Sequence, residues 1–414
     1  NDDEDLKDVV WSLEEARPDF LIFCQIKSQE VETITAFWKK VEKTPCGLLI
    51  VSDLYIELIP LNLRNVIIIK NKDFLLVQKI ILDFFYPISS ENKKLVGVTG
   101  TNGKSTTVDL ARQISTMMGH KAASLGTLGI KNYLGQLSST KSGLTTPPFI
   151  ELRKIIYHLL EVEGHEALFM EVSSHALSMN RIYGLTFMAI AWTSFGQDHL
   201  DFHESMEEYF LAKKSLYTDH LDKKGLAFVP ANEIELRKKL SDLPFRPTQK
   251  LSERGLVNAS LPFFLRPDFN QRNLEVAIDL NESLWGENPL SFFSPLKLRS
   301  LEGRFSLFKV EKKFFIVDFA HTPDGLMNIC KSIQEVFPQK KLILLFGCGG
   351  DRDPSKRPLM GAIAEKYAHK MVITSDNPRN EDPLKIILDI KSGLTNDLAK
   401  EVKSFADRRE SIEL

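Results

Sequence analysis

The sequence predicts an α/β protein with three domains. We expect a small N-terminal α/β domain over residues 1–92, a central domain with a parallel sheet over 93–298, and a C-terminal Rossmann-like domain over 299–414. Short apolar runs alternate with amphipathic helical patterns, as in parallel sheets covered by helices. A glycine-rich turn opens the central part, and several apolar runs in the last part end in polar clusters, where parallel sheets bind ligands.

Composition sets the broad class of the protein. The 414 residues are 43% hydrophobic and 26% charged, which suits a globular chain with two or three cores. A formal net charge of −2 gives no electrostatic case for nucleic acid or an anionic membrane. The four cysteines lack CxxC or zinc spacing, no apolar run reaches membrane-spanning length, and the acidic start NDDEDLKD does not fit a signal peptide. We therefore expect a cytoplasmic protein.

The first part of the chain reads as a small α/β domain without evident chemistry. It contains the segments FLIFCQI, ETITAFWKKVEK, CGLLIVS, NVIIIKN and FLLVQKIILDFFY, which suggest buried strands separated by amphipathic helices. Residues 87–92 are the expected linker.

The central part opens with LVGVTGTNGKSTT, residues 95–107, which has the layout of a phosphate-binding loop. An apolar run enters a glycine-rich turn and then a helical pattern, so backbone N–H groups and the helix N-terminus could surround phosphate oxygens. Lys104 could reach the terminal phosphates and the Ser105 hydroxyl could bind Mg²⁺. The strict pattern has glycine in place of Val98. Glycine-rich turns open many helices, but few unrelated turns supply this lysine, so we favour a P-loop ATPase-like parallel sheet.

Polar residues follow the predicted strands of the central domain. We expect parallel strands at 124–130, 167–173 and 187–194, with a helix over IELRKIIYHLLEVEG. Residues at the carboxyl ends of such strands should converge on the phosphate loop. They are Thr145, Thr146, Glu171, Ser173, Ser174, His175, Arg181, Asp198, His199, Asp201 and His203.

Spacing alone leaves the roles of these residues open. Glu171 follows an apolar run and is either a metal ligand or a surface or capping carboxylate. His199 and His203 are four residues apart, but no third zinc ligand has suitable spacing, so a metal ligand and a hydrogen-bonding histidine both remain. Lys213 lies in a helical pattern that places Tyr209 and nearby apolar residues on its buried side, and spacing gives this lysine no special role.

Two further stretches contribute candidates. Residues 231–268 are polar and predict loop or peripheral structure. Asp268 to Asn273 precede LEVAIDLNESLW, so Asn270 and Asn273 either cap a helix or contact nucleotide.

The last part repeats a strand that ends in polar residues. One strand ends at Asp318 before a helix that follows Pro323, and two more end in GCGGDRD and SDNPRNEDP. These patterns predict a Rossmann-like domain. Three arginines at such strand ends, Arg352, Arg357 and Arg379, favour an anionic substrate.

Taken together, these motifs resemble the Mur ligases of peptidoglycan precursor synthesis, and among them the members that add the third amino acid of the peptide. The motifs are VTGTNGKST, TTP, MEVSSHAL, DHLDFH, YFLAK, DFNQRN, EGR, VDFAHTPDGL, FGCGGDRD with KRP, and TSDNPRNEDP. They occur in one order from about residue 95 to residue 383.

The resemblance implies ATP-dependent amide formation with Mg²⁺, for which we expect two ions. The D-glutamate carboxylate of UDP-N-acetylmuramoyl-L-alanyl-D-glutamate (UDP-MurNAc-L-Ala-D-Glu) would be phosphorylated to an acyl phosphate and then captured by an amine. The DNPR form, Asp376 to Arg379, implies meso-diaminopimelate as the incoming amino acid, because an arginine can pair with its distal carboxylate. The expected partners are therefore small molecules, with neither nucleic acid nor membrane, and the enzyme is expected to be a monomer.

The resemblance also assigns roles to individual residues of this sequence. Lys104, Glu171, His199 and Lys213 would be catalytic, and the metal ligands would be Ser105, Glu171, His199 and Lys213, the last of them carbamylated. ATP would contact Gly100, Thr101, Asn102, Gly103, Lys104, Ser105, Thr106, Asn270, Asn273, Arg304, Asp318 and His321. Thr145, Thr146, Ser173 and Arg181 would bind the UDP-muramoyl dipeptide, and Arg352, Asp376, Asn377 and Arg379 the incoming amino acid.

The sequence departs from the family pattern in several places. Trp11-Ser12-Leu13 stands where a uridine-binding Asp-Ser-Arg motif is usual, so we expect a divergent N-terminal domain. Ser194-Phe195 replaces a common Asn-Leu pair, and Ser105 replaces a threonine. A GKGHE segment is expected after the last residue, Leu414, so we expect the C-terminal domain to be incomplete.

Three alternatives stay open. The chain could be a non-catalytic relative that binds nucleotide or precursor, a ligase that adds L-lysine, or a folylpolyglutamate synthetase. The last shares the ATP chemistry but not the DNPR stretch or the MEVSSHAL form. Phosphate release that requires Mg²⁺-ATP, the muramoyl dipeptide and an amino acid would separate them.

Overall fold

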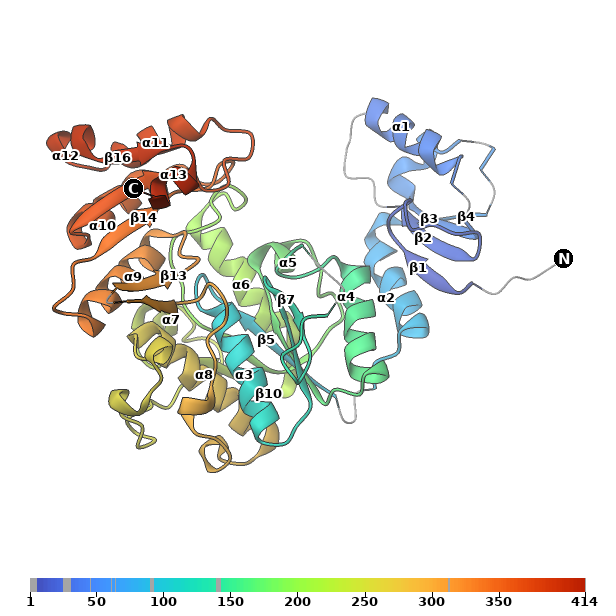
Figure 1. The fold of residues 1–414 in the computed structure, drawn as a ribbon. Coiled ribbons are helices and arrows are strands. Elements are labelled where there is room, and N and C mark those ends of the chain that lie inside the picture. The colour runs from blue at the N-terminus through green and yellow to red at the C-terminus, as the bar shows by residue number, and fades with distance from the viewer. Residues whose placement is uncertain are drawn as a thin grey trace. The chain divides into compact units, whose positions relative to one another are not determined.

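A computed structural model describes residues 6–24, 31–44, 46–60, 62–63, 65–89, 93–138, 143–311 and 313–413. The chain divides into two compact units, and Figure 1 shows its elements coloured along the sequence. The first unit contains Asn1–Lys93, Pro147–His165 and Asn180–Leu185, and the second contains Lys94–Thr146, Glu166–Met179 and Thr186–Leu414. The α/β class predicted from the sequence is confirmed, whereas the boundaries near residues 92 and 298 remain predictions.

The first unit is built on a four-stranded parallel sheet in the order β1-β2-β3-β4. Its elements are β1 (Asp8–Val10), β2 (Phe20–Cys24), α1 (Val31–Val41), β3 (Leu48–Ser52), β4 (Val66–Ile69), α2 (Phe74–Phe85) and α4 (Phe149–Tyr157), which a π-helical turn extends over His158–Val162. Alternate residues of β2 point to opposite faces, as the period of a strand requires. Ile22 packs in a cluster with Trp38 of α1, and Phe23 packs with Phe74 of α2. The apolar runs of this region therefore form a sheet that is buried on both faces. Of the predicted linker 87–92, residues 90–92 lie outside the described part of the chain.

The second unit contains a seven-stranded sheet in the order β11-β10-β9-β5-β8-β6-β7. Its strands are β5 (Lys94–Thr99), β6 (Ala122–Gly126), β7 (Gly129–Lys131), β8 (Ala167–Glu171), β9 (Phe187–Trp192), β10 (Leu221–Val229) and β11 (Arg246–Pro247). Each pair is parallel except β6 with β7. The single parallel strand predicted at 124–130 is therefore wrong: Gly129, with φ of +96°, lets the chain reverse through a two-residue turn.

Helices cover this sheet and carry much of the site. They are α3 (Lys104–Met117), α5 (Ser174–Ser178), α6 (Met206–His220), α7 (Ile234–Lys239) and α8 (Asp268–Trp285). Ala111 and Ile114 of α3 share one apolar cluster with Leu274 of α8 and Val96 of β5. The region 231–268 contains loops, the short helix α7 and the edge strand β11, as expected for loop or peripheral structure. One expectation needs correction: α8 begins at Asp268 after Pro267, so Asn270 and Asn273 lie inside its first turns rather than capping it.

The end of the second unit contains a hairpin and a parallel sheet. The hairpin joins β12 (Ser306–Val310) to β13 (Lys313–Val317), and the sheet has the order β14 (Ile343–Phe346), β15 (Lys370–Thr374), β16 (Lys403–Phe405). The helices are α9 (Pro323–Val336), α10 (Lys356–Tyr367), α11 (Pro383–Lys391), α12 (Asn396–Glu401) and α13 (Arg408–Glu413). We expected the strand that ends at Asp318 to belong to the parallel sheet. In the structure it pairs antiparallel with β12, because Glu311 adopts φ of +52° and turns the chain back.

Two buried carboxylates of α8 hold the segment 248–254. Glu275 accepts a hydrogen bond from the backbone N–H of Leu251 at 3.0 Å, and Asp279 accepts one from the N–H of Gln249 at 3.0 Å. Burial raises the pKa of Glu275 to about 7 and that of Asp279 to about 6. The folded protein therefore binds more protons at these groups than the unfolded chain does between about pH 4 and pH 7.

We expect these carboxylates to make the free energy of unfolding fall as the pH rises from about 5 to about 7. The slope of this fall corresponds to a difference of at most about one bound proton per group between the folded and unfolded states. Glu275→Gln should flatten this dependence in urea denaturation at pH 5 and pH 8, so the variant gains relative to wild type at the higher pH. Glu253→Gln, at an exposed position of the anchored segment, is the matched control. An equal difference between wild type and Glu275→Gln at both pH values would contradict the prediction.

Candidate active site

The glycine-rich turn between β5 and α3 is packed too closely for larger residues. Gly100 has φ of +147°, and a Cβ there would lie 2.1 Å from Thr193 Oγ1. Gly103 has φ of +91°, and a Cβ there would lie 2.4 Å from Asn273 Oδ1. The strand, turn and helix occur in the predicted order. The two glycines let the turn lie directly against the end of β9 and the first turns of α8.

Hydrogen bonds from the end of β9 hold this loop in shape. The backbone N–H of Thr101 donates to Ser194 O at 2.9 Å, and that of Asn102 donates to Ser194 Oγ at 2.9 Å. The hydroxyls of Thr101 and Tyr209 are 3.1 Å apart. Ser194 stood out in the sequence only as a departure from the family pattern, and the structure gives it a supporting role.

Lys104 is folded over the loop. Its Nζ donates to Gly100 O at 2.7 Å and to Thr101 O at 3.0 Å. Burial lowers the pKa of this ammonium, although the nearby carboxylates of Glu171 and Asp198 oppose the shift. The ammonium of Lys104 therefore adds to the positive potential at the N-terminus of α3, where an anion is favoured.

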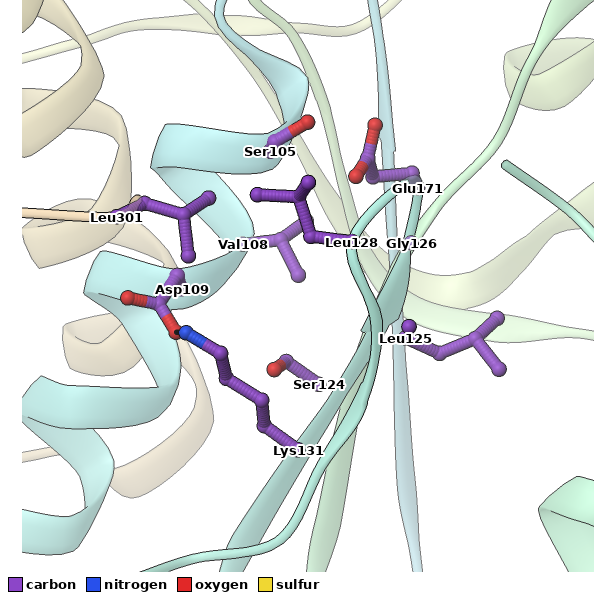
Figure 2. Close-up of a pocket in the computed structure, with 11 residues that line it drawn as sticks. Ser105, Val108, Asp109, Ser124, Leu125, Gly126, Leu128, Lys131, Glu171 and Leu301 are labelled. Carbon is purple, nitrogen blue, oxygen red and sulfur yellow. Dashed lines mark hydrogen bonds and ion pairs between the residues drawn. The ribbon is translucent and has the colours of Figure 1, made fainter. Parts of the chain in front are cut away.

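Glu171 and Ser105 line one pocket between α3 and the β6–β7 hairpin (Figure 2). The carboxylate of Glu171 is buried and accepts from the backbone N–H of Thr127 at 2.9 Å and from its hydroxyl at 3.2 Å. A Cβ at Gly126 would come within 2.0 Å of Glu171 Oε1. On the other side of the pocket, Figure 2 shows Asp109 paired with Lys131 at 3.3 Å. Glu171 is thus a fixed carboxylate in a pocket that the phosphate-loop helix also lines, which excludes the interpretation as a surface residue.

Three of the predicted dipeptide-binding residues gather around Glu171. Thr146 Oγ1 donates to Glu171 O at 2.9 Å and accepts from the N–H of Ser173 at 3.2 Å. Thr145 Oγ1 lies 3.0 Å from Thr127 Oγ1. Arg181 belongs to the first unit, where burial lowers its pKa and Glu151 opposes the shift.

His199 lies on a tight turn after β9. It adopts φ of +57°, and its Nε2 is 3.4 Å from Asp198 Oδ2. Among the described residues, its buried Nδ1 has no hydrogen-bond partner. Burial lowers the pKa of His199 to about 3; Asp198 opposes that shift, while His175, Lys104 and Lys213 add to it. The imidazole is therefore neutral, which is the form that binds a metal ion.

Asp198 connects several parts of the second unit. Its carboxylate is 3.5 Å from His321 Nε2 and 3.5 Å from Lys356 Nζ. Burial alone would raise the pKa of Asp198, but the hydrogen bond from His321 and the charges of His321 and Lys356 hold it well below its usual value. His321, predicted to contact nucleotide, is thereby placed beside the turn that carries His199.

Lys213 is fully enclosed, unlike most lysines in the middle of a helix. Its Nζ donates to Gly100 O at 3.1 Å and lies 4.6 Å from the centre of the Tyr209 ring. Burial, followed by the charge of Lys104, lowers its pKa well below the usual value. The helical pattern correctly placed Tyr209 on the buried side. Lys213 and Lys104 therefore share one backbone acceptor, the carbonyl of Gly100.

A second pocket, of about 1040 Å³ counting the part open to solvent, adjoins the loop. Seven of the residues predicted to bind nucleotide line it: Asn102, Gly103, Thr106, Asn270, Asn273, Arg304 and Asp318. Arg304 Nη2 donates to Ser105 Oγ at 3.3 Å, and Asp318 accepts from the N–H of Phe305 at 2.7 Å. Glu233 and Asp324 also line the pocket. Glu233 lies outside the quoted motifs, and Asp324 lies within VDFAHTPDGL but had been given no role.

The predicted amino-acid pocket lies at the ends of β14 and β15. Asn377 O accepts from the N–H of Gly350 at 2.8 Å, and Arg379, with φ of +49°, donates through Nη1 to Gly350 O. Asp376 lies 3.9 Å from Arg408 Nη2, and Arg352 Nη1 is 3.0 Å from Asp201 Oδ2. Arg357 needs a correction. It is buried and bound by Glu381 at 2.7 Å and Asp389 at 2.8 Å, so its charge is already neutralised within the fold.

The donors around the loop fit magnesium better than zinc. Within the described ranges, no three His, Cys, Asp or Glu side chains come together as a metal-binding group. Mg²⁺ keeps several waters and is usually held by one or two protein groups together with phosphate oxygens. The carboxylate of Glu171, the hydroxyl of Ser105 and the unpartnered Nδ1 of His199 suit that pattern.

A phosphate-binding type of loop, buried lysines and a large pocket meet at the strand ends of this sheet. These features define a class of nucleotide-dependent enzymes. Residues 98–261 match the Mur ligase middle domain, and residues 303–414 match the Mur ligase glutamate ligase domain. The chain belongs to the Mur ligase family and is an ATP-dependent ligase. Family membership also implies use of Mg²⁺.

Two curated relatives have the same printed name, UDP-N-acetylmuramoyl-L-alanyl-D-glutamate--2,6-diaminopimelate ligase. The protein of Prochlorococcus marinus is 35% identical over 91% of this chain and 80% of its own length. That of Aquifex aeolicus is 37% identical over 79% of this chain and 70% of its own length.

Solved structures agree on the fold. A structure of a ligase with that same name has a TM-score of 0.61 and 25% identity, covering 99% of this chain and 86% of its own. A Mycobacterium tuberculosis folylpolyglutamate synthase complexed with ADP and AMPPCP has a TM-score of 0.63 at 15% identity, covering 82% and 87% of the two chains, which shows the shared fold alone. Among the described helices, we find none with the length and apolar character needed to cross a membrane.

Proposed function

We propose that the protein joins meso-diaminopimelate to the D-glutamate side chain of UDP-MurNAc-L-Ala-D-Glu. The observation that carries this proposal is the meeting of Lys104, Lys213 and Ser194 at one loop, beside the Glu171 pocket and the nucleotide pocket, in a chain of this family. The names of the relatives support the choice of substrates. The enzyme is proposed to act as a cytoplasmic monomer without nucleic-acid or membrane partners.

The chemistry uses ATP to turn a poor acylating group into a good one. A carboxylate oxygen of D-glutamate attacks the γ-phosphorus of ATP, and ADP leaves. The amine then attacks the carbonyl carbon of the acyl phosphate, loses a proton and expels phosphate. Because each step moves negative charge between oxygens, the contribution of the protein is positioning and charge neutralisation. Lys104 is held where it can neutralise that charge.

The buried side chains around the loop are proposed to hold two Mg²⁺ ions. Ser105, Glu171 and His199 would supply ligands, and the ions would neutralise phosphate charge when bound. Lys213 would contribute a further ligand after carbamylation, in which its neutral amine adds to CO₂ and loses a proton. Its burial and lowered pKa favour the neutral amine that this reaction needs.

The remaining predicted residues are proposed to bind the two other substrates. Thr145, Thr146, Ser173 and Arg181 would contact the muramoyl dipeptide. Asp376, Asn377 and Arg379 would hold the distal end of diaminopimelate, with Arg379 paired to its far carboxylate. Arg352 would take the carboxylate nearer the reacting amine.

Phosphate release from Mg²⁺-ATP tests the proposal. We expect release only when both the muramoyl dipeptide and an amino acid are present, with meso-diaminopimelate far better than L-lysine. If neither amino acid stimulates release, the protein is not an active ligase of this kind. If L-lysine is the better substrate, the assignment of Arg379 to a distal carboxylate is wrong. If folate and glutamate replace the dipeptide and diaminopimelate, the protein is a folylpolyglutamate synthetase.

A further inference from the structure

The ion pair between Asp201 and Arg352 joins two segments that are 151 residues apart in sequence. Asp201 Oδ2 and Arg352 Nη1 are 3.0 Å apart, and their side chains are 21% and 40% exposed. Exposed ion pairs contribute little to stability, so stability alone does not account for this pair. Both charged groups are accessible to a small molecule.

We propose that Asp201 and Arg352 together bind the charged head group of the incoming amino acid, with Asp201 holding the ammonium group that becomes the nucleophile. This inference rests on the proposed function. An α-amino acid carries its ammonium and carboxylate on one carbon, so the two charges are close together. A carboxylate beside a guanidinium presents the same two charges with opposite signs.

Neighbouring contacts fix the spacing of this pair. Gln197 Nε2 donates to Asp353 Oδ2 at 3.1 Å and to Ser355 Oγ at 3.0 Å. Lys356 Nζ lies 3.5 Å from Asp198 Oδ1. Residues that precede Asp201 are thus attached to residues that follow Arg352. The head-group site is therefore built into the fold before an amino acid arrives, which lowers the cost of binding it.

The position of Asp201 also suits delivery of the amine. It lies two residues after His199, on a turn closed by the hydrogen bond from His203 N–H to His199 O at 2.9 Å. An ammonium held by Asp201 is therefore next to the turn that carries the proposed metal ligand. Correct placement of a nucleophile contributes a large part of the rate of such reactions.

The variant Asp201→Asn separates binding of the ammonium group from mere pairing with Arg352 and from a structural role. We expect it to raise the KM for meso-diaminopimelate about tenfold or more, while the KM for ATP changes by less than about twofold. Inhibition by pimelate, which has both carboxylates of diaminopimelate and neither amine, should be unchanged or stronger. Asp201→Glu, which keeps the charge, should recover part of the loss.

Three results would overturn the inference. A lower KM for diaminopimelate would mean that Asp201 merely occupies Arg352, and a parallel rise in the KM for ATP with weaker pimelate inhibition would mean a structural role. Asp242→Asn is the matched control, because Asp242 pairs with Lys214 at 2.6 Å outside the proposed site. If wild-type protein shows no release dependent on diaminopimelate, the proposed function fails; if wild type is active and Asp201→Asn behaves like it, only this inference fails.

Discussion

Replacing Lys213 by alanine is expected to lower the turnover number about 10²- to 10³-fold, the usual cost of removing one charge-stabilising group from an active site. Lys213 is enclosed against Gly100 O and the ring of Tyr209, where a charged ammonium gains little solvation. A side chain kept neutral in such a place is suited to become a carbamate ligand. Turnover is measured as phosphate release with saturating substrates, and intact-protein mass shows whether wild type carries the added CO₂.

Lys214→Ala is the control for this prediction. Lys214 is the next residue of α6, but its Nζ forms an ion pair with Asp242 at 2.6 Å. Its removal should leave turnover within about twofold of wild type, because surface ion pairs contribute little. Equal losses in the two variants would indicate damage to α6 rather than loss of a ligand, and wild-type turnover in Lys213→Ala would remove Lys213 from the mechanism.

Features set by local sequence could be predicted. The turn from β5 to α3 follows from glycines that alone fit its backbone and from a lysine at the start of the helix. The burial of β2 on both faces also follows from its continuous apolar run, FLIFC. The break between β6 and β7 could not be read with the same certainty, because an apolar run with two glycines suits one strand as well as a tight hairpin.

Features set by tertiary contacts could not be predicted. Most lysines in the middle of a helix are solvated, and spacing indicated no special role for Lys213; the packing of α6 against the loop encloses it. Asp198 joins distant segments, because His321 and Lys356, more than 120 residues away in sequence, both contact its carboxylate. Arg357 shows the opposite error. Its place after a strand end suggested substrate, but Glu381 and Asp389 already bind it.

Replacing Lys104 by methionine is expected to lower kcat/KM for ATP about 10²- to 10³-fold. Methionine is close to lysine in length and lacks the charge, so the variant removes the bonds to Gly100 O and Thr101 O while filling similar space. Titration of nucleotide into the variant should show weaker ATP binding. Unchanged ATP affinity and turnover would mean that the loop does not use Lys104 for phosphate.

The same substitution bears on Lys213. The charge of Lys104 is one of the causes that lower the Lys213 pKa, so its removal should raise that pKa and leave less neutral amine. Lys104→Met should therefore carry less of the added CO₂ than wild type at a given bicarbonate concentration, as measured by intact-protein mass. Lys121→Met, at an exposed position just before β6, should carry as much as wild type.

Because Lys104 and Lys213 share the acceptor Gly100 O, the double variant should lose less activity than the product of the two single losses.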